Sequence, residues 1–377
     1  MTLTVREISA QEHLAYLNTR ESVSFLQIPA WGKVKSEWGH FSIGWFTEDG
    51  QQVGAGLVLT RQVPRIRRYL AYLPEGPDLD WRGERTPDTI AEWLDPMLAV
   101  LKRKGAFAVK MGPQVAVRSW QAQTIKSAIS SGSAKRLRDI PPDWEDSGAV
   151  AIADSLRAHG WRQDTTESTG FGDIQPRYVF QVGLADKTED DVLRGFNQLW
   201  RRNIKKAEKA GVTVRRGTRA DLAAFHPVYQ ETAERDGFLA RPLSYFQGMW
   251  DALNTEQPDR MSVYLAEHEG RVLAATTMVR VGTHVWYSYG ASSNTGREVR
   301  PSNAIQWRMI TDSLASGARV YDLRGISDTI DPDDPLFGLI QFKLGTGGYA
   351  LEYIGEWDFA LRPVLAWAFD QYMARRK

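Results

Sequence analysis

The chain has 377 residues, 42% of them hydrophobic, and its 47 basic and 46 acidic residues give a net charge of +1. This length favours two domains with separate cores, and the near-neutral charge argues against a surface that binds polyanions over its whole extent. The absence of cysteine excludes disulfides, thiolate metal sites and a cysteine nucleophile. Charges near the N-terminus and the lack of a long apolar run predict a cytoplasmic protein without signal peptide or membrane span.

In chain order, the sequence contains one pattern of elements twice. Each copy begins with a strand ending in Thr-Val-Arg, at residues 4–6 and 213–215. A helix follows, and then a second helix introduced by Pro29 or Pro242, at the position where proline is tolerated. The remaining elements of each copy are a hairpin (41–63 and 261–282), a tyrosine-bearing strand (67–77 and 284–293), a helix (88–106 and 302–318) and a strand (107–113 and 319–325). This order resembles the GNAT acyltransferase fold and predicts an α/β (α+β) protein with two tandem GNAT-like domains.

Between the copies, the polar segment IPPDWEDSGA (140–149) is the expected linker. Residues 188–212 are predicted to form one helix that Gly211 ends. Its apolar stripe comprises Phe196, Trp200, Ile204 and Ala207. Its other side carries Arg201, Arg202, Lys205, Lys206 and Lys209. This basic ridge is either a binding surface for an RNA backbone or an ordinary solvated face.

Several common catalytic signatures are missing from the sequence. It has no Walker A loop, no G-x-S-x-G elbow and no H-E-x-x-H, and its six histidines are scattered. The segments where a GNAT enzyme would bind the pyrophosphate of acetyl-CoA, 75–89 and 292–303, lack tight glycine spacing. We therefore expect no metal and no cofactor.

Three polar positions remain as candidates for chemistry. Arg241, before the helix at Pro242, and Tyr245, one turn on, form either a phosphate site or a surface arginine beside a half-buried tyrosine. Lys35, on the corresponding helix of the first copy, is either an equivalent binding residue or a solvated lysine. Lys343, between Phe342 and a glycine-rich turn, either stabilises an oxyanion at the floor of a cleft or extends its amine to solvent. The pattern alone favours the solvated lysine.

Seven segments in one order resemble the Fem family (FemABX), the aminoacyl-tRNA-dependent transferases that build peptidoglycan interpeptide bridges. They are FLQIPAWGKVKSEWG, RRNIKKAEKAGV, ERDGFLARPLSYF, YSYGASS, PSNAIQWRMI, YDLRGI and IQFKLGTGG. Because RRNIKKAEKAGV runs directly into the second copy, the chain is similar to the FemX-like type without a coiled-coil arm. The resemblance implies a first domain of residues 1–155 plus 357–377 on the precursor side. It implies a second domain, residues 156–356, for the tRNA acceptor end and catalysis.

The resemblance also implies roles for individual residues. Lys35, Arg241 and Tyr245 would bind the phosphates or sugar of the precursor, and Tyr289 would line the peptide end of the site. Lys343, with Phe342 before it, would lie near the ester carbonyl. If the basic ridge binds RNA, its residues Arg201, Arg202, Lys205, Lys206 and Lys209 would be the contacts of the tRNA. Where the family often has an aspartate before proline, this chain has Gly112, which leaves a precursor contact from that strand in doubt.

The implied reaction moves glycine, alanine or serine from aminoacyl-tRNA to the stem-peptide side-chain amine of lipid II or UDP-MurNAc-pentapeptide. We expect a monomer with no metal or cofactor. Two alternatives stay open: an aminoacyl-tRNA-dependent transferase acting on a protein N-terminus or a lipid, and a non-catalytic cell-wall scaffold. The basic run RQVPRIRRY (61–69) either touches the inner face of the membrane peripherally or is simply solvated.

Overall fold

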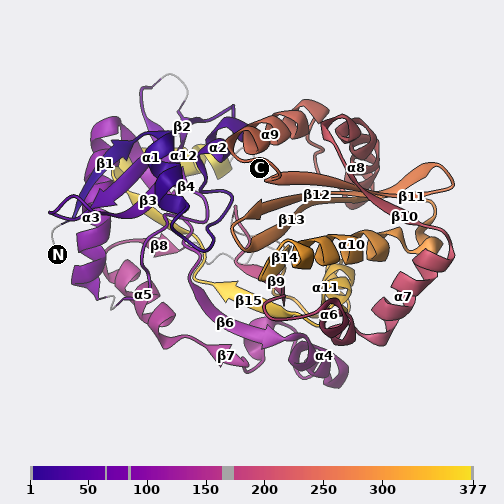
Figure 1. Cartoon of the computed structure of the whole chain (residues 1–377). Helices are drawn as coiled ribbons and strands as arrows, with labels where there is room; N and C mark the ends of the chain where they lie inside the picture. The colour runs from indigo at the N-terminus through magenta and orange to yellow at the C-terminus, as the bar shows by residue number, and fades with distance from the viewer. Residues whose placement is uncertain (1–2, 64–65, 84–85, 164–173, 375–377) are drawn as a thin grey trace. The chain divides into compact units, whose positions relative to one another are not determined.

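The computed structural model describes residues 3–63, 66–83, 86–163 and 174–374, and it divides the chain into two compact units (Figure 1). Unit 1 comprises residues 1–119, 144–177 and 352–377, and unit 2 comprises residues 120–143 and 178–351. The chain therefore passes from one unit to the other four times. Among the described residues, no helix has the length and apolar character needed to cross a membrane.

Unit 1 contains a mixed sheet with the strand order β1-β2-β3-β4-β5-β16-β8. Its strands are β1 (Thr4–Ile8), β2 (Gly39–Phe46), β3 (Gln52–Gln62), β4 (Tyr69–Leu73), β5 (Ala106–Met111), β8 (Arg162–Gln163) and β16 (Trp357–Ala360). Its helices are α1 (Ala10–Leu17), α2 (Pro29–Val34), α3 (Pro87–Lys104), α5 (Ser147–Ala158) and α12 (Pro363–Ala374). Helices α1 and α2 pack on β2 and β3, while α3 packs on β1 and β5.

Unit 2 contains most of the second sheet, in the order β10-β11-β12-β13-β14-β9-β15, which β6 and β7 extend. The strands are β6 (Ala116–Gln121), β7 (Trp144–Glu145), β9 (Tyr178–Gly183), β10 (Thr213–Gly217), β11 (Met261–His268), β12 (Arg271–Val281), β13 (His284–Ser292), β14 (Val320–Ile326) and β15 (Tyr349–Tyr353). The helices are α4 (Ala122–Ser131), α6 (Glu189–Gly195), α7 (Gln198–Lys209), α8 (Leu222–Asp236), α9 (Leu243–Glu256), α10 (Pro301–Ala315) and α11 (Phe337–Leu344). Helices α8 and α9 lie on one face of β11–β13, and α10 lies on the other (Figure 1).

Local sequence signals explain where several elements begin and end. Ser9 and Thr86 cap α1 and α3 through reciprocal hydrogen bonds with the residue three positions on. Pro29 opens α2 at its first position, as expected, whereas Pro242 is the residue just before α9. Gly105 ends α3 with φ of 105°, a conformation that glycine adopts without strain.

The predicted repeat is present in both units. In unit 1, β1 to β4 form an antiparallel series and β5 pairs parallel to β4; in unit 2, β10 to β13 and β14 do the same. The parallel pairs differ in length. Strands β4 and β5 pair along the whole of β4, but β13 and β14 pair only over His284–Trp286 and Val320–Asp322. Beyond Trp286 the two strands of unit 2 separate.

The structure differs from the sequence-based expectation in two places. The unit boundaries fall at 119, 143, 177 and 351 rather than at 155 and 356, because Ile152 and Leu156 of α5 belong to the core of unit 1 while Trp120 and Ile125 belong to that of unit 2. The prediction of a single helix over residues 188–212 is wrong. The segment forms two helices, α6 and α7, because Asn197 caps α7 by accepting from Trp200 N at 2.8 Å.

Candidate active site

Lys343 is buried in unit 2, so the prediction of a solvated lysine, which the sequence pattern favoured, is wrong. Its side chain is 4% exposed, and Nζ donates to the carbonyl oxygens of Gly325 at 2.6 Å and Arg324 at 3.3 Å. Burial lowers the pKa of Lys343 to about 7; Asp322 opposes this effect and Arg324 adds to it. An amine held in this way changes its charge near neutral pH.

The carbonyl groups that bind Lys343 are presented by an irregular end of β14. The register between β14 and β9 shifts between Asp322 and Gly325, and Arg324 has φ of 62°, which is unusual for a residue with a side chain. Asp322 supports this turn, because its carboxylate accepts from Arg324 N at 2.5 Å. Gln181 Nε2 also donates to this carboxylate, at 3.0 Å.

Asp322 is itself a buried carboxylate beside Lys343. Burial raises its pKa, but the hydrogen bond and charge of His284, with Arg324 and Gln181, outweigh this effect and leave the pKa lowered. His284 Nε2 lies 3.4 Å from the carboxylate, and its ring stacks on Trp286 at 4.0 Å. Asp322 therefore supplies negative charge close to the lysine. Neither Asp322 nor His284 was predicted as a site residue, because nothing in the strand sequence RVYDLRG distinguishes a buried aspartate from an exposed one.

The glycines after Lys343 let α11 approach its neighbours closely. A Cβ on Gly345 would lie 2.0 Å from the Trp200 ring, and a Cβ on Gly347, which has φ of 69°, would lie 2.0 Å from the carbonyl oxygen of Gly195. Trp200 Nε1 donates to the carbonyl of Phe342 at 2.9 Å, and the two rings are 4.7 Å apart. Phe342 therefore fixes the end of α11 against α7.

Arg241 and Tyr245, the residues of the predicted phosphate site, lie close together, and Tyr289, predicted for the peptide end, lies beside Tyr245. The Arg241 guanidinium lies 4.8 Å from the centre of the Tyr245 ring, and the Tyr245 and Tyr289 hydroxyls are 3.2 Å apart. Among the described residues, none caps the N-terminus of α9 with a side-chain hydrogen bond. The backbone N–H groups of its first turn are thus next to an arginine and two hydroxyls, an arrangement that suits an anion.

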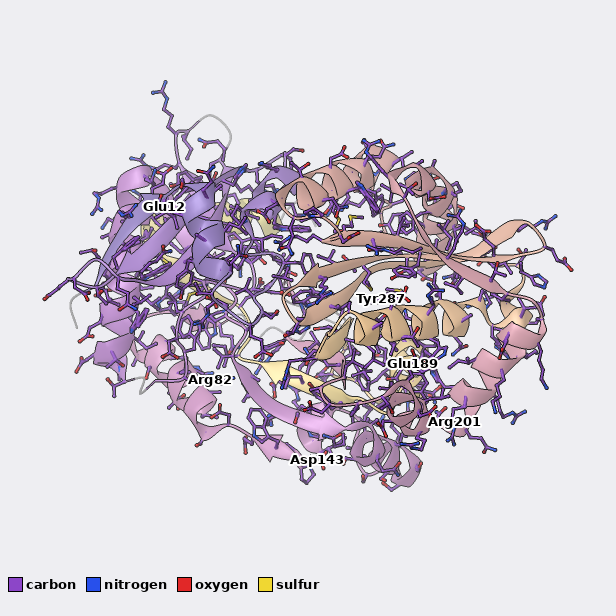
Figure 2. The ribbon with its side chains drawn as sticks, in the orientation of Figure 1. Glu12, Arg82, Asp143, Glu189, Arg201 and Tyr287 are labelled. Carbon is purple, nitrogen blue, oxygen red and sulfur yellow. The ribbon has the colours of Figure 1, made fainter. Side chains whose placement is uncertain are left out.

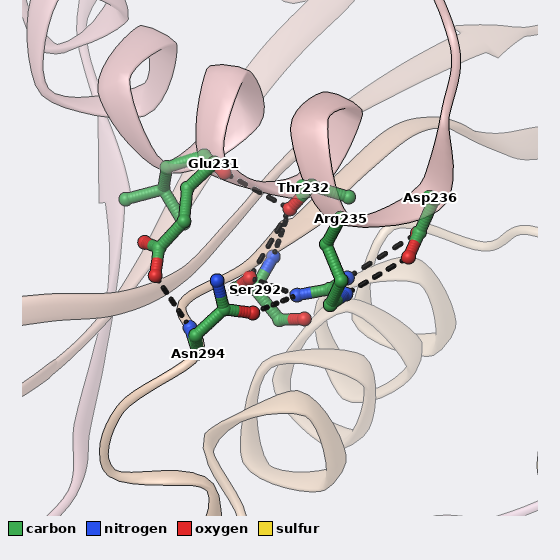
Figure 3. Close-up of polar contacts among 7 residues, drawn as sticks. Glu231, Thr232, Arg235, Asp236, Ser292 and Asn294 are labelled. Carbon is green, nitrogen blue, oxygen red and sulfur yellow. Dashed lines mark hydrogen bonds and ion pairs between the residues drawn. The ribbon is translucent and has the colours of Figure 1, made fainter.

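A polar network holds α8 to the end of β13 beside these tyrosines (Figure 3). Thr232 Oγ1 accepts from Ser292 N at 2.9 Å, and Arg235 Nη1 donates to the Ser292 carbonyl at 2.8 Å. Glu231 accepts from Asn294 N at 2.7 Å. Tyr289 is also fixed within its strand, because its N–H donates to Thr277 Oγ1 at a register shift between β12 and β13. The sequence does not reveal this network, because its partners are 57 to 63 residues apart.

Lys35 belongs to unit 1 and has a different setting. It is the C-terminal cap of α2, and its Nζ lies 5.5 Å from the Trp31 ring. Gly112 follows β5, and a Cβ built on it would lie 3.1 Å from Glu356 Cγ. The Glu356 carboxylate accepts from the Tyr72 hydroxyl at 2.5 Å. A buried glutamate side chain therefore fills the space next to this glycine.

The basic ridge of α7 is exposed, and Arg201 marks it in Figure 2. Arg201, Arg202 and Lys205 line a hollow of about 310 Å³ with Leu193, Gln198 and Ile204. Within the described residues, the five ridge cations form no ion pair, whereas Arg215 and Arg219 nearby in the sequence are paired with Asp221 and Asp251. The opposite side of α7 buries Trp200 and Ala207, as the stripe predicted.

Known proteins resemble this chain along its length. The lipid II:glycine glycyltransferase of Staphylococcus haemolyticus (strain JCSC1435) is 26% identical over 435 aligned residues, covering 98% of this chain and 95% of the relative. The crystal structure of FemX matches with a TM-score of 0.78 at 24% identity, covering 96% of this chain and 98% of that one. A tandem GNAT protein from the clavulanic acid biosynthesis pathway matches with a TM-score of 0.53 at 11% identity, covering 95% and 98%.

These comparisons establish the fold and the family. The two structural matches show that the fold is that of two GNAT-like domains, as the repeat predicted. The alignment with the glycyltransferase is longer than the 377 residues of this chain, so the relative carries residues that this chain lacks. Strand β10 begins at Thr213, directly after α7 ends at Lys209, and no coiled-coil arm interrupts the described chain there. The FemAB family model matches residues 8–269 and 264–373, and the chain therefore belongs to the FemAB family.

Proposed function

We propose that this protein transfers an amino acid from aminoacyl-tRNA to the side-chain amine of the stem peptide in a peptidoglycan precursor. The observation that carries the proposal is the buried Lys343, held by two carbonyls where β13 and β14 separate, in a chain of the FemAB family. The curated relatives are glycyltransferases that act on lipid II, so glycine is the first amino acid to test. We expect the protein to act in the cytoplasm as a monomer.

The reaction needs an ordered arrangement of substrates more than a covalent intermediate. The precursor amine attacks the ester carbonyl of the aminoacyl-tRNA, a C–N bond forms, and the C–O bond to the terminal ribose breaks. The amine loses a proton and the ribose oxygen gains one. In this scheme the Lys343 ammonium donates its remaining N–H to the carbonyl oxygen and stabilises the negative charge that develops there. Phe342, packed on Trp200, is a positioning residue for this lysine.

The anionic parts of both substrates have candidate partners. Arg241, the first turn of α9, Tyr245 and Tyr289 would bind the phosphates and neighbouring groups of the precursor in unit 2. Lys35 would add a cation from unit 1. The ridge of α7, with its five cations outside any described ion pair, would bind the tRNA backbone through salt-sensitive contacts. None of these assignments requires a metal or a cofactor.

Mass spectrometry of a transfer reaction tests the proposal. The protein is incubated with tRNA charged with glycine, alanine or serine and with either lipid II or UDP-MurNAc-pentapeptide. We expect a product one residue heavier than the precursor with at least one pair of substrates. If no combination gives this product while the same precursors bind, the transfer reaction is not the function.

A further inference from the structure

An exposed apolar stripe runs along α12 in unit 1. Val364 and Trp367 are 82% and 65% exposed, and Ala368 is exposed beside them. Their spacing of three and four residues places them on one side of the helix. The other side of α12 is anchored, because the Phe369 ring lies 5.2 Å from that of Phe107. The apolar stripe is therefore presented outward by a helix that is packed on its far side.

A group of cations lies in unit 1 next to Gly105, directly before the start of β5. Arg67 and Arg68 precede β4, and Lys102 and Arg103 lie in the last turn of α3. A Cβ built on Gly105, the cap of α3, would lie 3.6 Å from Arg68 Nη1 and 3.7 Å from the Arg67 carbonyl. The two pairs of basic residues are thus neighbours. None of the four forms an ion pair with another described residue, whereas the adjacent Lys104 is paired with Glu7.

The start of α12 and these cations lie at the same end of β5. Phe107, on which Phe369 packs, is two residues from Gly105, and its carbonyl accepts from Arg362 N at 2.9 Å just before α12 begins. Ile66, which is 40% exposed, adds an apolar side chain next to Arg67. The sequence continues beyond α12 with three more basic residues, Arg375, Arg376 and Lys377.

Local helix electrostatics explain only part of this pattern. Lys102 and Arg103 suit the negative end of the α3 dipole, but Arg67 and Arg68 belong to another element. Trp367 gains nothing from that dipole. Cations that form no ion pair with a described residue, beside an exposed tryptophan on a largely apolar helix, complement an anionic headgroup layer over an apolar interior.

We propose that Val364, Trp367, Ile66, Arg67, Arg68, Lys102 and Arg103 form a membrane face that docks on a bilayer rich in anionic phospholipid. Trp367 and Val364 enter the boundary between headgroups and acyl chains, and the cations contact the phosphates. The proposal rests on the proposed function in one respect: docking would bring the enzyme to a lipid-linked acceptor.

Vesicle sedimentation tests the membrane face with the full chain. The protein is mixed with vesicles of phosphatidylcholine alone, or of phosphatidylcholine and phosphatidylglycerol in equal parts. We expect binding to the mixed vesicles only. Trp367→Ser should weaken it about tenfold, and Arg67→Gln with Arg103→Gln should weaken it on the order of tenfold or more. All three side chains are exposed, so circular dichroism should show unchanged folding.

Matched variants test whether vesicle binding depends on the membrane face in particular. Trp144→Ser removes an exposed tryptophan elsewhere in unit 1, and Lys205→Gln with Lys206→Gln removes two cations from the α7 ridge; both should bind vesicles like the parent. Equal loss in these controls, equal binding to neutral vesicles, or a dimer in solution that Trp367→Ser converts to monomer would overturn the proposal.

The membrane face and the proposed function can fail separately. Transfer to a water-soluble precursor should be unchanged in the Trp367→Ser and Arg67→Gln/Arg103→Gln variants, whereas transfer to lipid II in mixed vesicles should fall with vesicle binding. Vesicle binding without any transfer would support the membrane face and contradict the proposed function. If transfer to vesicle-bound lipid II is the same in these variants as in the parent, the membrane face alone is contradicted.

Discussion

The amino group of Lys343 has two of its hydrogen-bonding positions taken by backbone carbonyls. An ammonium then has one N–H left for a substrate oxygen, whereas a neutral amine has only a lone pair. Protonation of this one group therefore decides whether the site can stabilise an oxyanion. Since burial lowers the pKa of Lys343 to about 7, the protonation state of this lysine changes within the physiological pH range.

This titration predicts a pH profile for transfer. The attacking amine must be neutral, so the single-turnover rate should rise with pH at first. As pH passes about 7, Lys343 loses its proton and the rise should flatten. In Lys343→Arg, whose side chain stays charged, the rate should be lower but should keep rising beyond that pH. The same flattening in the arginine variant would contradict the role of the lysine.

Lys343→Met separates catalysis from binding in the same assay. It should reduce the single-turnover rate on the order of a hundredfold or more, as expected for loss of an oxyanion donor. Precursor affinity, measured by calorimetry, should change little, because Arg241, Tyr245 and Tyr289 are intact. Equal losses of rate and affinity would mean that the lysine is a binding group.

At the scale of elements, two glycines at α11 offer a matched test of packing. Gly347→Ala forces a Cβ to within 2.0 Å of the Gly195 carbonyl at a positive φ, so we expect a loss of about 2 kcal/mol or more in the free energy of unfolding. Gly338→Ala meets no atom within 4 Å and should stabilise α11 by roughly 0.5 kcal/mol. Denaturant unfolding measures both. A harmless Gly347→Ala would show that this close approach is dispensable.

The elements show what the sequence could and could not predict. Strands, hairpins and helices of both repeats follow from periodicity and turn residues, which are local signals. The break at Phe196 has one local signal, Asn197, which caps α7; the second contact of Asn197, from its N–H to Gly345 O far along the chain, could not be read from the sequence. The burial of Lys343 depends likewise on carbonyls exposed by the irregular end of β14. In the site, the spacing of Arg241 and Tyr245 predicted that they are neighbours, and their side chains do lie together, whereas the contact of Tyr245 with Tyr289 and the Asp322–His284 pair required the structure.

At the scale of the whole molecule, a net charge of +1 gives almost no overall attraction for RNA. The salt dependence of tRNA binding should therefore come from the local ridge on α7. We expect the slope of log K against log salt to fall in magnitude by roughly 2 when Lys205, Lys206 and Lys209 are changed to Gln. Filter binding over a range of salt concentrations measures this slope.

A charge-matched variant controls for general electrostatics in that experiment. Arg67→Gln with Lys102→Gln and Arg103→Gln removes the same number of cations from unit 1 and should leave the slope unchanged. If both triple variants reduce the slope equally, tRNA binding is diffuse and the ridge has no special part in it.

The sheet of unit 1 has β16 between β5 and β8, although β16 is formed by residues 357–360 and β5 by residues 106–111. During synthesis the ribosome releases β1 to β5 early, but the neighbour that β5 needs comes only after all of unit 2 has been translated. Unit 2 has its own strands complete before then, up to β15. The unit that emerges first is therefore the last to be finished, and until then β5 presents an open strand edge to the cell.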